Sequence, residues 1–258
     1  MMLSLLLALP FAGAIACSLT KAESSLRISF AVLLLFLLGS VAAMLMVPPG
    51  SVDADALFVL DALAAPLLPV FAFVHLLSHL GTAKTVTTPG YCVRSLLAAG
   101  LSALALTSHN DNLLMLMLIL SIGLPLWELR DRGRSGRAFF LYMLAFCVLM
   151  FASMLTGLAE RTPLSVGLLL LALIIRGGLF PAHSWLPLLF TSATYGTSLL
   201  FILPLMEILV VIRVLLMAIP EWMLEAIGIL CLVSAVYCGG MAMVQVQVSR
   251  FFAFLCLS

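Results

Sequence analysis

The amino-acid sequence predicts an all-α fold, a polytopic bundle of transmembrane helices, and three features of the chain support this prediction. Hydrophobic residues make up 64% of the 258 residues and charged residues only 9%, and the mean hydropathy is +1.28. A soluble domain of this length cannot bury so much apolar surface. The apolar residues also form runs of about twenty, the length of a membrane-crossing helix, and basic residues recur in alternate loops.

The apolar runs predict about nine spans and part of a tenth. The first run lacks the basic start and the cleavage signal of a secretory signal peptide, so we expect it to remain as a span. A last apolar piece begins at Val248 and stops at Ser258, which is too short to cross a bilayer as a helix. We expect either a chain that ends within this element or a neighbouring chain that completes it. The nine spans are expected near residues 2–19, 28–47, 57–81, 92–108, 112–128, 138–158, 164–180, 196–217 and 221–245.

Basic residues concentrate in the odd-numbered loops and predict the orientation of the chain. By the positive-inside rule these loops are cytoplasmic, and the N-terminus is then outside. The loop at residues 129–137 carries four arginines, which we interpret as a topology anchor rather than as a contact for nucleic acid or lipid headgroups. No basic patch with interleaved aromatic residues predicts a nucleic-acid partner. The basic loop residues are Lys21, Arg27, Lys84, Arg94, Arg130, Arg132, Arg134 and Arg137.

Arg176 lies inside a long apolar run, and the chain then carries helix-breaking residues. A charge at bilayer depth costs roughly 2.5–3.5 kcal/mol, so it persists where it has a partner or a wet cavity. Glycine and proline interrupt helical hydrogen bonding and leave backbone N–H and C=O groups unpaired. A membrane tolerates such groups only where protein or water covers them. A charge beside a broken helix therefore predicts an ion path. The residues that shape the predicted break are Gly177, Gly178, Pro181, Trp185 and Pro187.

Glu207 is the carboxylate that the sequence places in the middle of a span. At about 1.5 Å per residue, its depth agrees with that of Arg176 to within about one helical turn. We therefore predict that the two side chains form a pair. One interpretation is a structural ion pair, and the other is a proton-exchanging couple in which Glu207 titrates against Arg176.

Histidines supply the other candidate proton carriers, because imidazole titrates near neutral pH. His183 follows the predicted break, where it acts either as a proton shuttle or as a cap for freed carbonyl groups. His75 and His79 share one helix face at i, i+4 spacing. No carboxylate or cysteine accompanies them at matching depth, so we expect no metal site. We also expect no catalytic site and no cofactor, since the chain has no phosphate loop and no nucleophile with a base.

Several segments resemble the antiporter-like membrane subunits of respiratory complex I, Mrp-type antiporters, energy-converting hydrogenases and inorganic-carbon uptake complexes. Pro181, His183, Trp185 and Pro187 match the seventh-helix pattern of that family, with Arg176 at the position of the family lysine. The resemblance implies three helices at 1–90, a first five-helix repeat at 91–217 and a truncated second repeat at 218–258. The other matching segments are residues 58–63, 75–78, 111–114 and 245–254.

Other positions depart from the family pattern. Leu120 stands where the family has a fifth-helix glutamate, and Gln247 and Ser249 replace an aspartate and a lysine. Glu128 lies two turns beyond Leu120, beside the arginine-rich loop, and is not expected to substitute for the glutamate. An arginine also differs from the family lysine because a guanidinium keeps its proton.

The resemblance implies a membrane subunit that takes part in proton or cation translocation, coupled to a partner's redox or inorganic-carbon chemistry. The alternative is a non-conducting scaffold derived from such a subunit, and an independent transporter is the third hypothesis. Arg176, Glu207, His183 and His75 are the predicted proton-translocation residues. The expected partners are other membrane subunits, one of which completes the second repeat, and a peripheral catalytic subunit. The expected location is a bacterial inner membrane or an equivalent energy-coupling membrane.

Overall fold

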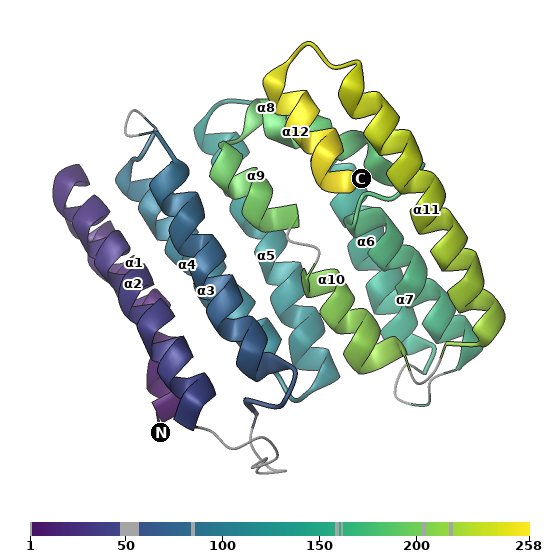
Figure 1. Cartoon of the computed structure of the whole chain (residues 1–258), viewed down its shortest axis with the longest axis horizontal. Helices are drawn as coiled ribbons and strands as arrows, with labels where there is room; N and C mark the ends of the chain where they lie inside the picture. The colour runs from purple at the N-terminus through teal and green to yellow at the C-terminus, as the bar shows by residue number, and fades with distance from the viewer. Residues whose placement is uncertain are drawn as a thin grey trace. The chain divides into compact units, whose positions relative to one another are not determined.

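The computed structural model describes residues 2–46, 57–83, 86–157, 160, 162–202, 205–216 and 219–258, and their regular structure is helical apart from one isolated bridge. The all-α prediction is confirmed. In chain order the elements are α1 (Met2–Ser18), α2 (Ala22–Met46), α3 (Ala64–Gly81), α4 (Pro89–Thr107), α5 (Asp111–Asp131), α6 (Arg137–Leu155), α7 (Pro163–Arg176), the 3-10 helix η1 (Ala182–Ser184), α8 (Trp185–Ser192), α9 (Tyr195–Ile202), α10 (Leu205–Val210), the π-helix η2 (Val211–Leu215), α11 (Glu221–Met243) and α12 (Val248–Leu257) (Figure 1).

Seven stretches of helix in the described residues are long and apolar enough to cross a membrane, and α1, α7 and α12 are shorter apolar helices. Each expected span overlaps one or more of these helices, but three boundaries differ by four residues or more. The second span begins at Ala22 rather than near 28, because the helix includes the polar residues that precede the apolar run. The seventh span ends at Arg176 rather than near 180, because the chain turns at the two following glycines. Lys84 and the expected span ends at 47, 158 and 217 lie outside the described residues.

The third span begins at Ala64 rather than near 57. Phe58 instead pairs with Ser108 in the isolated antiparallel bridge. The Asp61 carboxylate accepts a hydrogen bond from the backbone N–H of Ala64 at 2.6 Å, which satisfies a donor at the start of the helix. Asp61 therefore caps α3, and the residues before it are extended.

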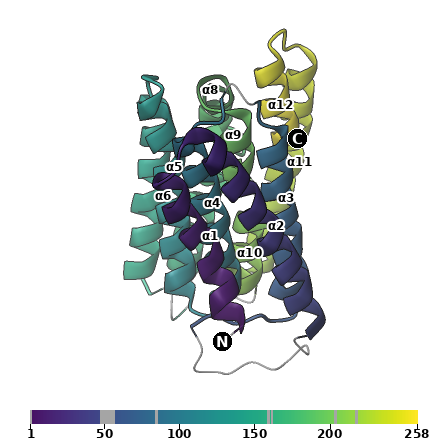
Figure 2. The same cartoon turned by 90° about the vertical axis from the view of Figure 1, so that its left-hand side faces the viewer.

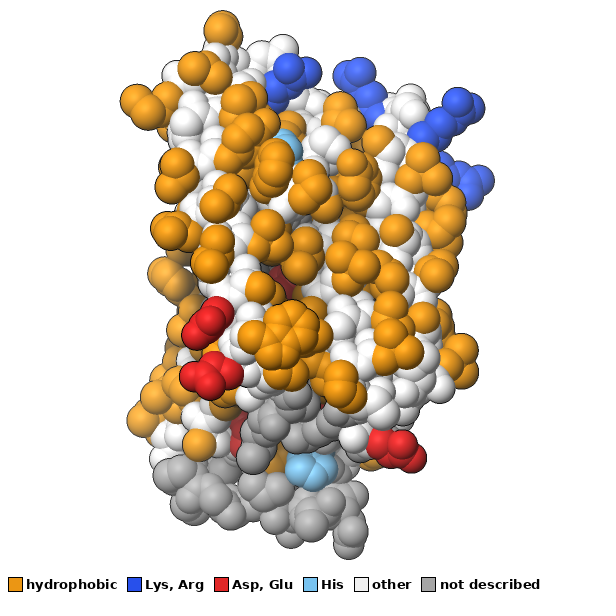
Figure 3. All heavy atoms as spheres, turned by 90° about the vertical axis from the view of Figure 1, so that its right-hand side faces the viewer, with side chains coloured by type: hydrophobic (Ala, Val, Ile, Leu, Met, Phe, Trp, Pro, Cys, Tyr) orange, Lys and Arg blue, Asp and Glu red, His pale blue; other side chains and the backbone are white. Residues whose placement is uncertain are grey.

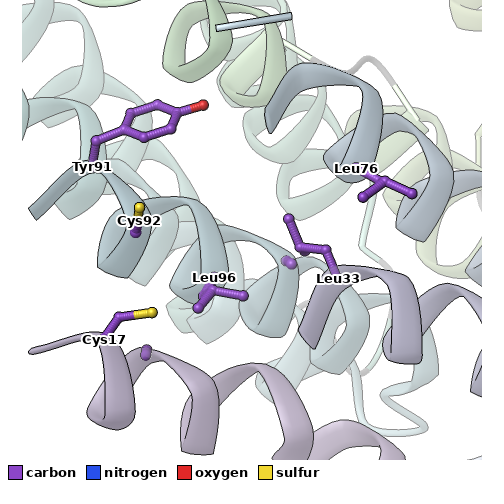
Figure 4. Close-up of a cluster of buried hydrophobic side chains, with 8 residues drawn as sticks. Cys17, Leu33, Leu76, Tyr91, Cys92 and Leu96 are labelled. Carbon is purple, nitrogen blue, oxygen red and sulfur yellow. The ribbon is translucent and has the colours of Figure 1, made fainter. Parts of the chain in front are cut away.

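The chain folds into two compact units, residues 1–124 with 199–201 and residues 125–198 with 202–258. In the first unit α1 packs on α2 and α4, and α2 packs on α3 (Figure 2). Buried side chains from four helices form its core, with Leu33 from α2, Leu76 from α3 and Leu96 from α4 (Figure 4). Two buried cysteines, Cys17 and Cys92, fill the same core as thiols.

In the second unit α6 packs along α7, and α12 packs against both α8 and α11. Cys238 and Ala242 of α11 meet Phe254 of α12 in a small buried cluster. The short α12 thus returns along the end of α11, as Figure 1 shows. These units are defined by contacts between residues, and such contacts do not test whether the chain contains a structural repeat. The repeats at 91–217 and 218–258 therefore stay a prediction.

The face that carries α11 is covered by hydrophobic side chains, with basic side chains at one end and acidic side chains toward the other (Figure 3). Ile229, Leu232 and Val236 are each at least 65% exposed. Soluble monomers rarely expose so large an apolar surface, whereas lipid covers it without cost. The chain is therefore an integral membrane protein.

A substitution at Gly13 of α1 tests how closely α1 packs against α2. A Cβ at this position would lie 2.8 Å from Val32 Cγ1 and 3.2 Å from Val32 Cβ. We expect Gly13→Ala to lower the free energy of unfolding by about 1 kcal/mol, because overpacking outweighs the gain in helix propensity. Equilibrium unfolding in mixed detergent micelles measures the change.

Gly228 of α11 is the matched control, since a Cβ there meets nothing within 4 Å. Gly228→Ala is expected to leave the stability unchanged or raise it slightly. Equal destabilisation by both substitutions would contradict the close packing of α1 on α2.

Candidate functional site

The break after α7 is built from a glycine in the left-handed region. Gly178 has a φ of +65°, a conformation that residues with a Cβ rarely adopt. The N–H of Gly177 donates to Leu173 O at 2.8 Å, and the N–H of Leu179 donates to Ile174 O at 3.1 Å. These bonds satisfy carbonyl groups of the last helical turn. The sequence prediction of a break directly after Arg176 is confirmed.

Neighbouring helices hold the segment after the break through three hydrogen bonds. Trp185, which is buried, donates from its indole Nε1–H to Ile175 O at 3.0 Å. The N–H of Phe180 donates to Ser234 Oγ of α11 at 3.0 Å. Tyr142 of α6 shares a hydrogen bond with the Ser184 hydroxyl at 2.7 Å. Protein groups therefore cover backbone that the break exposes. Trp185 caps the Ile175 carbonyl, a role that was one of the two predicted for His183.

Arg176 and Glu207 form a buried ion pair, with 2.9 Å between Nε and Oε1. The two residues are only 4% and 9% exposed, so neither charge relies on solvent. The Arg176 guanidinium also lies 5.4 Å from the centre of the Phe146 ring, within cation–π range. The predicted contact between the two charges is confirmed.

The position of each charge suits its sign. Arg176 ends α7, where the helix dipole favours a cation. Glu207 lies on α10, and its second oxygen, Oε2, is buried with no hydrogen-bond partner among the described residues. A carboxylate held by one oxygen keeps an acceptor site for a proton or for water on the other.

His183 lies among aromatic rings. Its ring centroid is 5.2 Å from that of Tyr237, 5.9 Å from Phe180 and 6.0 Å from Phe254. Tyr237 belongs to α11 and Phe254 to α12, so the ring joins both helices to the break. These contacts therefore assign His183 a role in packing.

His75 is fully buried in α3, and neither ring nitrogen has a hydrogen-bond partner among the described residues. It belongs to the first unit, whereas Arg176, Glu207 and His183 belong to the second. The structure thus groups three of the four predicted proton-translocation residues in one unit. Across the described ranges, no cluster of three or more His, Cys, Asp or Glu side chains has the spacing to hold a metal ion.

Glu128 is a fully buried carboxylate that was not among the predicted site residues. It accepts hydrogen bonds from the N–H of Thr194 at 2.7 Å, from the Thr194 hydroxyl at 3.3 Å and from the Thr197 hydroxyl. Arg132 Nε lies 2.9 Å from its Oε1. The carboxylate therefore binds the start of α9 to the end of α5.

A sequence signal for this contact was present. Thr194 precedes α9, and a threonine at that place predicts a helix N-terminus, which favours a nearby carboxylate. Glu128 and Arg132 also have the i, i+4 spacing of a helical ion pair. Arg132 thus has a structural partner, whereas Arg130, Arg134 and Arg137 are exposed, as a topology anchor requires.

Comparisons with known proteins agree with the fold. Residues 136–258 match the family model described as NADH:quinone oxidoreductase/Mrp antiporter, TM. A chain of respiratory complex I from Thermus thermophilus with bound NADH is 21% identical, with a TM-score of 0.82 over 100% of this chain. A chain of the archaeal membrane-bound sulfane sulfur reductase is 17% identical, with a TM-score of 0.79 over 99% of this chain.

This chain spans 62% of the length of each of those two solved chains. No curated protein matches it. The solved structures support the fold, and the family model matches residues 136–258, a little under half of the sequence, which include the break, Arg176 and Glu207. The chain therefore shares the fold of these membrane subunits, and its C-terminal part resembles the family model.

Trp185→Phe tests the cap at the break. The substitution removes the indole N–H and leaves Ile175 O without that donor, so we expect a loss of about 1–3 kcal/mol in unfolding free energy. Trp222→Phe is the control, because Trp222 is 64% exposed on α11. Denaturant unfolding in micelles measures both, and an equal effect of the two would show that the indole hydrogen bond does not stabilise the break.

Glu128→Gln tests the contact between α5 and α9. An amide removes the negative charge and presents N–H groups to donors, so we expect a loss of about 1.5–3 kcal/mol. Glu225→Gln changes an exposed carboxylate of α11 in the same way and is expected to have little effect. If Glu128→Gln unfolds at the same denaturant concentration as the control, the buried carboxylate does not hold the two helices together.

Proposed function

We propose that this chain is an antiporter-like membrane subunit that takes part in translocating protons or cations within a multi-subunit membrane complex. The observation that carries the proposal is the buried Arg176–Glu207 ion pair beside a covered helix break. The solved chains that it resembles belong to respiratory complex I and to a membrane-bound sulfane sulfur reductase, which are assemblies of several subunits.

The chemistry of the pair divides the roles between its members. A guanidinium keeps its proton, so Arg176 supplies a fixed positive charge. Glu207 is the member that binds and releases a proton, through the oxygen that has no partner among the described residues. When Glu207 is neutral, Arg176 loses its counter-charge, and the buried cation then favours the return of a negative charge. This alternation supports charge movement through the second unit.

The remaining predicted residues take different parts in this proposal. Gly177, Gly178, Trp185 and the two prolines hold the break and so fix the position of Arg176. The aromatic surroundings of His183 favour a structural role for that residue, which is the observation that supports the alternative of a non-conducting scaffold. The proton-translocation role of His75 stays a prediction.

We further propose that the arginine-rich loop at 129–137 faces the cytoplasm and that the N-terminus is outside. The arrangement of charges at the two ends of the α11 face supports a fixed orientation (Figure 3). A bacterial inner membrane, a neighbouring subunit that supplies the second repeat and a peripheral catalytic subunit stay predictions. Affinity purification of the tagged chain from its native membrane, followed by identification of the co-purified subunits, tests them.

Glu207→Gln is the direct test of translocation. The assembly that contains this chain is reconstituted into liposomes loaded with a pH-sensitive dye, and a potassium diffusion potential drives proton entry. We expect the wild-type flux to exceed that of protein-free liposomes. Glu207→Gln should lower it toward the protein-free level, because an amide cannot carry a proton.

Glu225→Gln is the matched control, since it removes an exposed carboxylate from the same unit. It is expected to leave the flux unchanged. A wild-type flux equal to that of protein-free liposomes would favour the non-conducting scaffold. A normal flux through Glu207→Gln would remove Glu207 from the path while leaving its contact with Arg176 intact.

A further inference from the structure

The first unit contains a buried polar seam between α3 and α4, two helices that pack on each other. We use the term α3–α4 seam for five side chains, His75, Ser78 and His79 of α3 and Tyr91 and Ser95 of α4. All five residues are at least 92% buried, and the core of the unit surrounds them. Such a concentration of polar groups is unusual in an apolar bundle and needs a physical reason.

The outer end of the seam is hydrogen-bonded and lies where α3 ends and α4 begins. The Tyr91 and Thr82 hydroxyls are 2.8 Å apart. The His79 ring stacks on the Tyr91 ring at 5.8 Å with an interplanar angle of 14°. His79 Nε2 lies 2.9 Å from the Ser29 hydroxyl of α2. Thr82 is partly exposed, so this end reaches the surface of the unit.

The inner end has polar atoms without partners. Both ring nitrogens of His75 and the hydroxyls of Ser78 and Ser95 are buried and unpaired within the described residues. His79 stacks on Tyr91, and the two helices run in opposite directions. His75 lies one helical turn before His79 on α3, and Ser95 lies one turn after Tyr91 on α4, so these two residues are level with each other. The unpaired groups of the two helices thus lie at the same depth.

The seam ends one turn beyond His75. Leu68, Phe71 and Ala72 continue α3 as fully buried apolar residues. From Thr82 to His75 the helix advances by seven residues, or roughly 10 Å. The polar groups therefore form a blind inlet and not a path across the bundle.

Water accounts for the unpaired groups. An unpaired buried polar group costs about 1–3 kcal/mol, and internal water relieves this cost where two or more polar atoms converge. The imidazole at the blind end also exchanges protons readily, since one ring nitrogen accepts while the other donates. Ionisable residues of the helices around the seam include His79, Tyr91, Cys92, Arg94 and Cys17, which are buried, and Glu23 and Arg27 of α2, which are exposed.

We propose that the α3–α4 seam is a hydrated inlet that carries protons from the surface end at Thr82 to His75. A proton that seam water delivers to the free nitrogen of neutral His75 gives the imidazolium. Return of the proton from the other nitrogen to the seam water restores the neutral ring as its second tautomer. The ligands of this site are water and the proton. The inlet lies in the first unit and stands independently of the Arg176–Glu207 pair.

The chain contains only four histidines, so ring-¹⁵N labelling makes a direct test simple. The full chain is placed in lipid bilayers, and solid-state NMR records transfer from water protons to the histidine ring nitrogens. The variants His75→Asn and His109→Asn assign two of the signals. His109 is exposed and gives the intensity expected of a hydrated ring.

We expect His75 in the wild-type chain to show water cross-peaks similar to those of His109, and exchange between its two tautomers. A His75 ring that stays in one tautomer with no water cross-peak would overturn the proposal. This measurement uses the wild-type protein, so it does not depend on whether any variant folds. It is also independent of proton flux and of Glu207.

Ser95→Val fills the seam with apolar volume and should abolish the water cross-peaks at His75 while leaving those at His109. Ser40→Val is the matched control, because Ser40 is also fully buried but already donates to Leu37 O at 2.7 Å and lies on α2 outside the seam. Retention of the His75 cross-peaks in Ser95→Val would contradict the inlet. So would their loss in Ser40→Val with the fold intact.

Discussion

A positive charge inside an apolar bundle needs a negative partner, and the local structure of the second unit follows from the way Arg176 meets Glu207. Burying either charge alone costs several kcal/mol, and the pair recovers this cost only when its geometry is good. The geometry requires α7 to end at Arg176, and it requires the segment beyond the break to be held in place. The tight turn at Gly178 and the hydrogen bonds of Trp185, Phe180 and Ser184 meet these two requirements.

The same rule of paired charges explains the second buried carboxylate. Glu128 has an arginine partner and receives three donors from the start of α9, so its charge is neutralised and its oxygens are occupied. Glu207 has an arginine partner but keeps Oε2 without a partner in the described part of the chain. This difference assigns Glu128 to structure and leaves Glu207 as the carboxylate with capacity for proton exchange. Burial alone does not separate the two residues, whereas counting the donors to each oxygen does.

Much of this arrangement could be predicted from the sequence, because hydropathy and helix breakers act locally. The spans, the break and the depth match between Arg176 and Glu207 depend on runs of apolar residues and on a rise of about 1.5 Å per residue. Contacts between distant segments could not be predicted in the same way. The donors to Glu128 come from residues 66 and 69 positions away, and the ring partners of His183 come from α11 and α12. The start of α3 at Ala64 could not be predicted either, since Phe58 and its neighbours are apolar enough to resemble helix.

A double-mutant cycle on Arg176 and Glu207 tests most directly whether the buried pair organises the second unit. Replacing one member by methionine leaves the other charge buried and unpaired, so Arg176→Met and Glu207→Met should each lose about 3–5 kcal/mol of unfolding free energy. The double variant removes both charges and should unfold close to the wild type, with a coupling energy of several kcal/mol. If the losses of the two single variants simply add in the double variant, the charges do not depend on each other. That result would contradict the account.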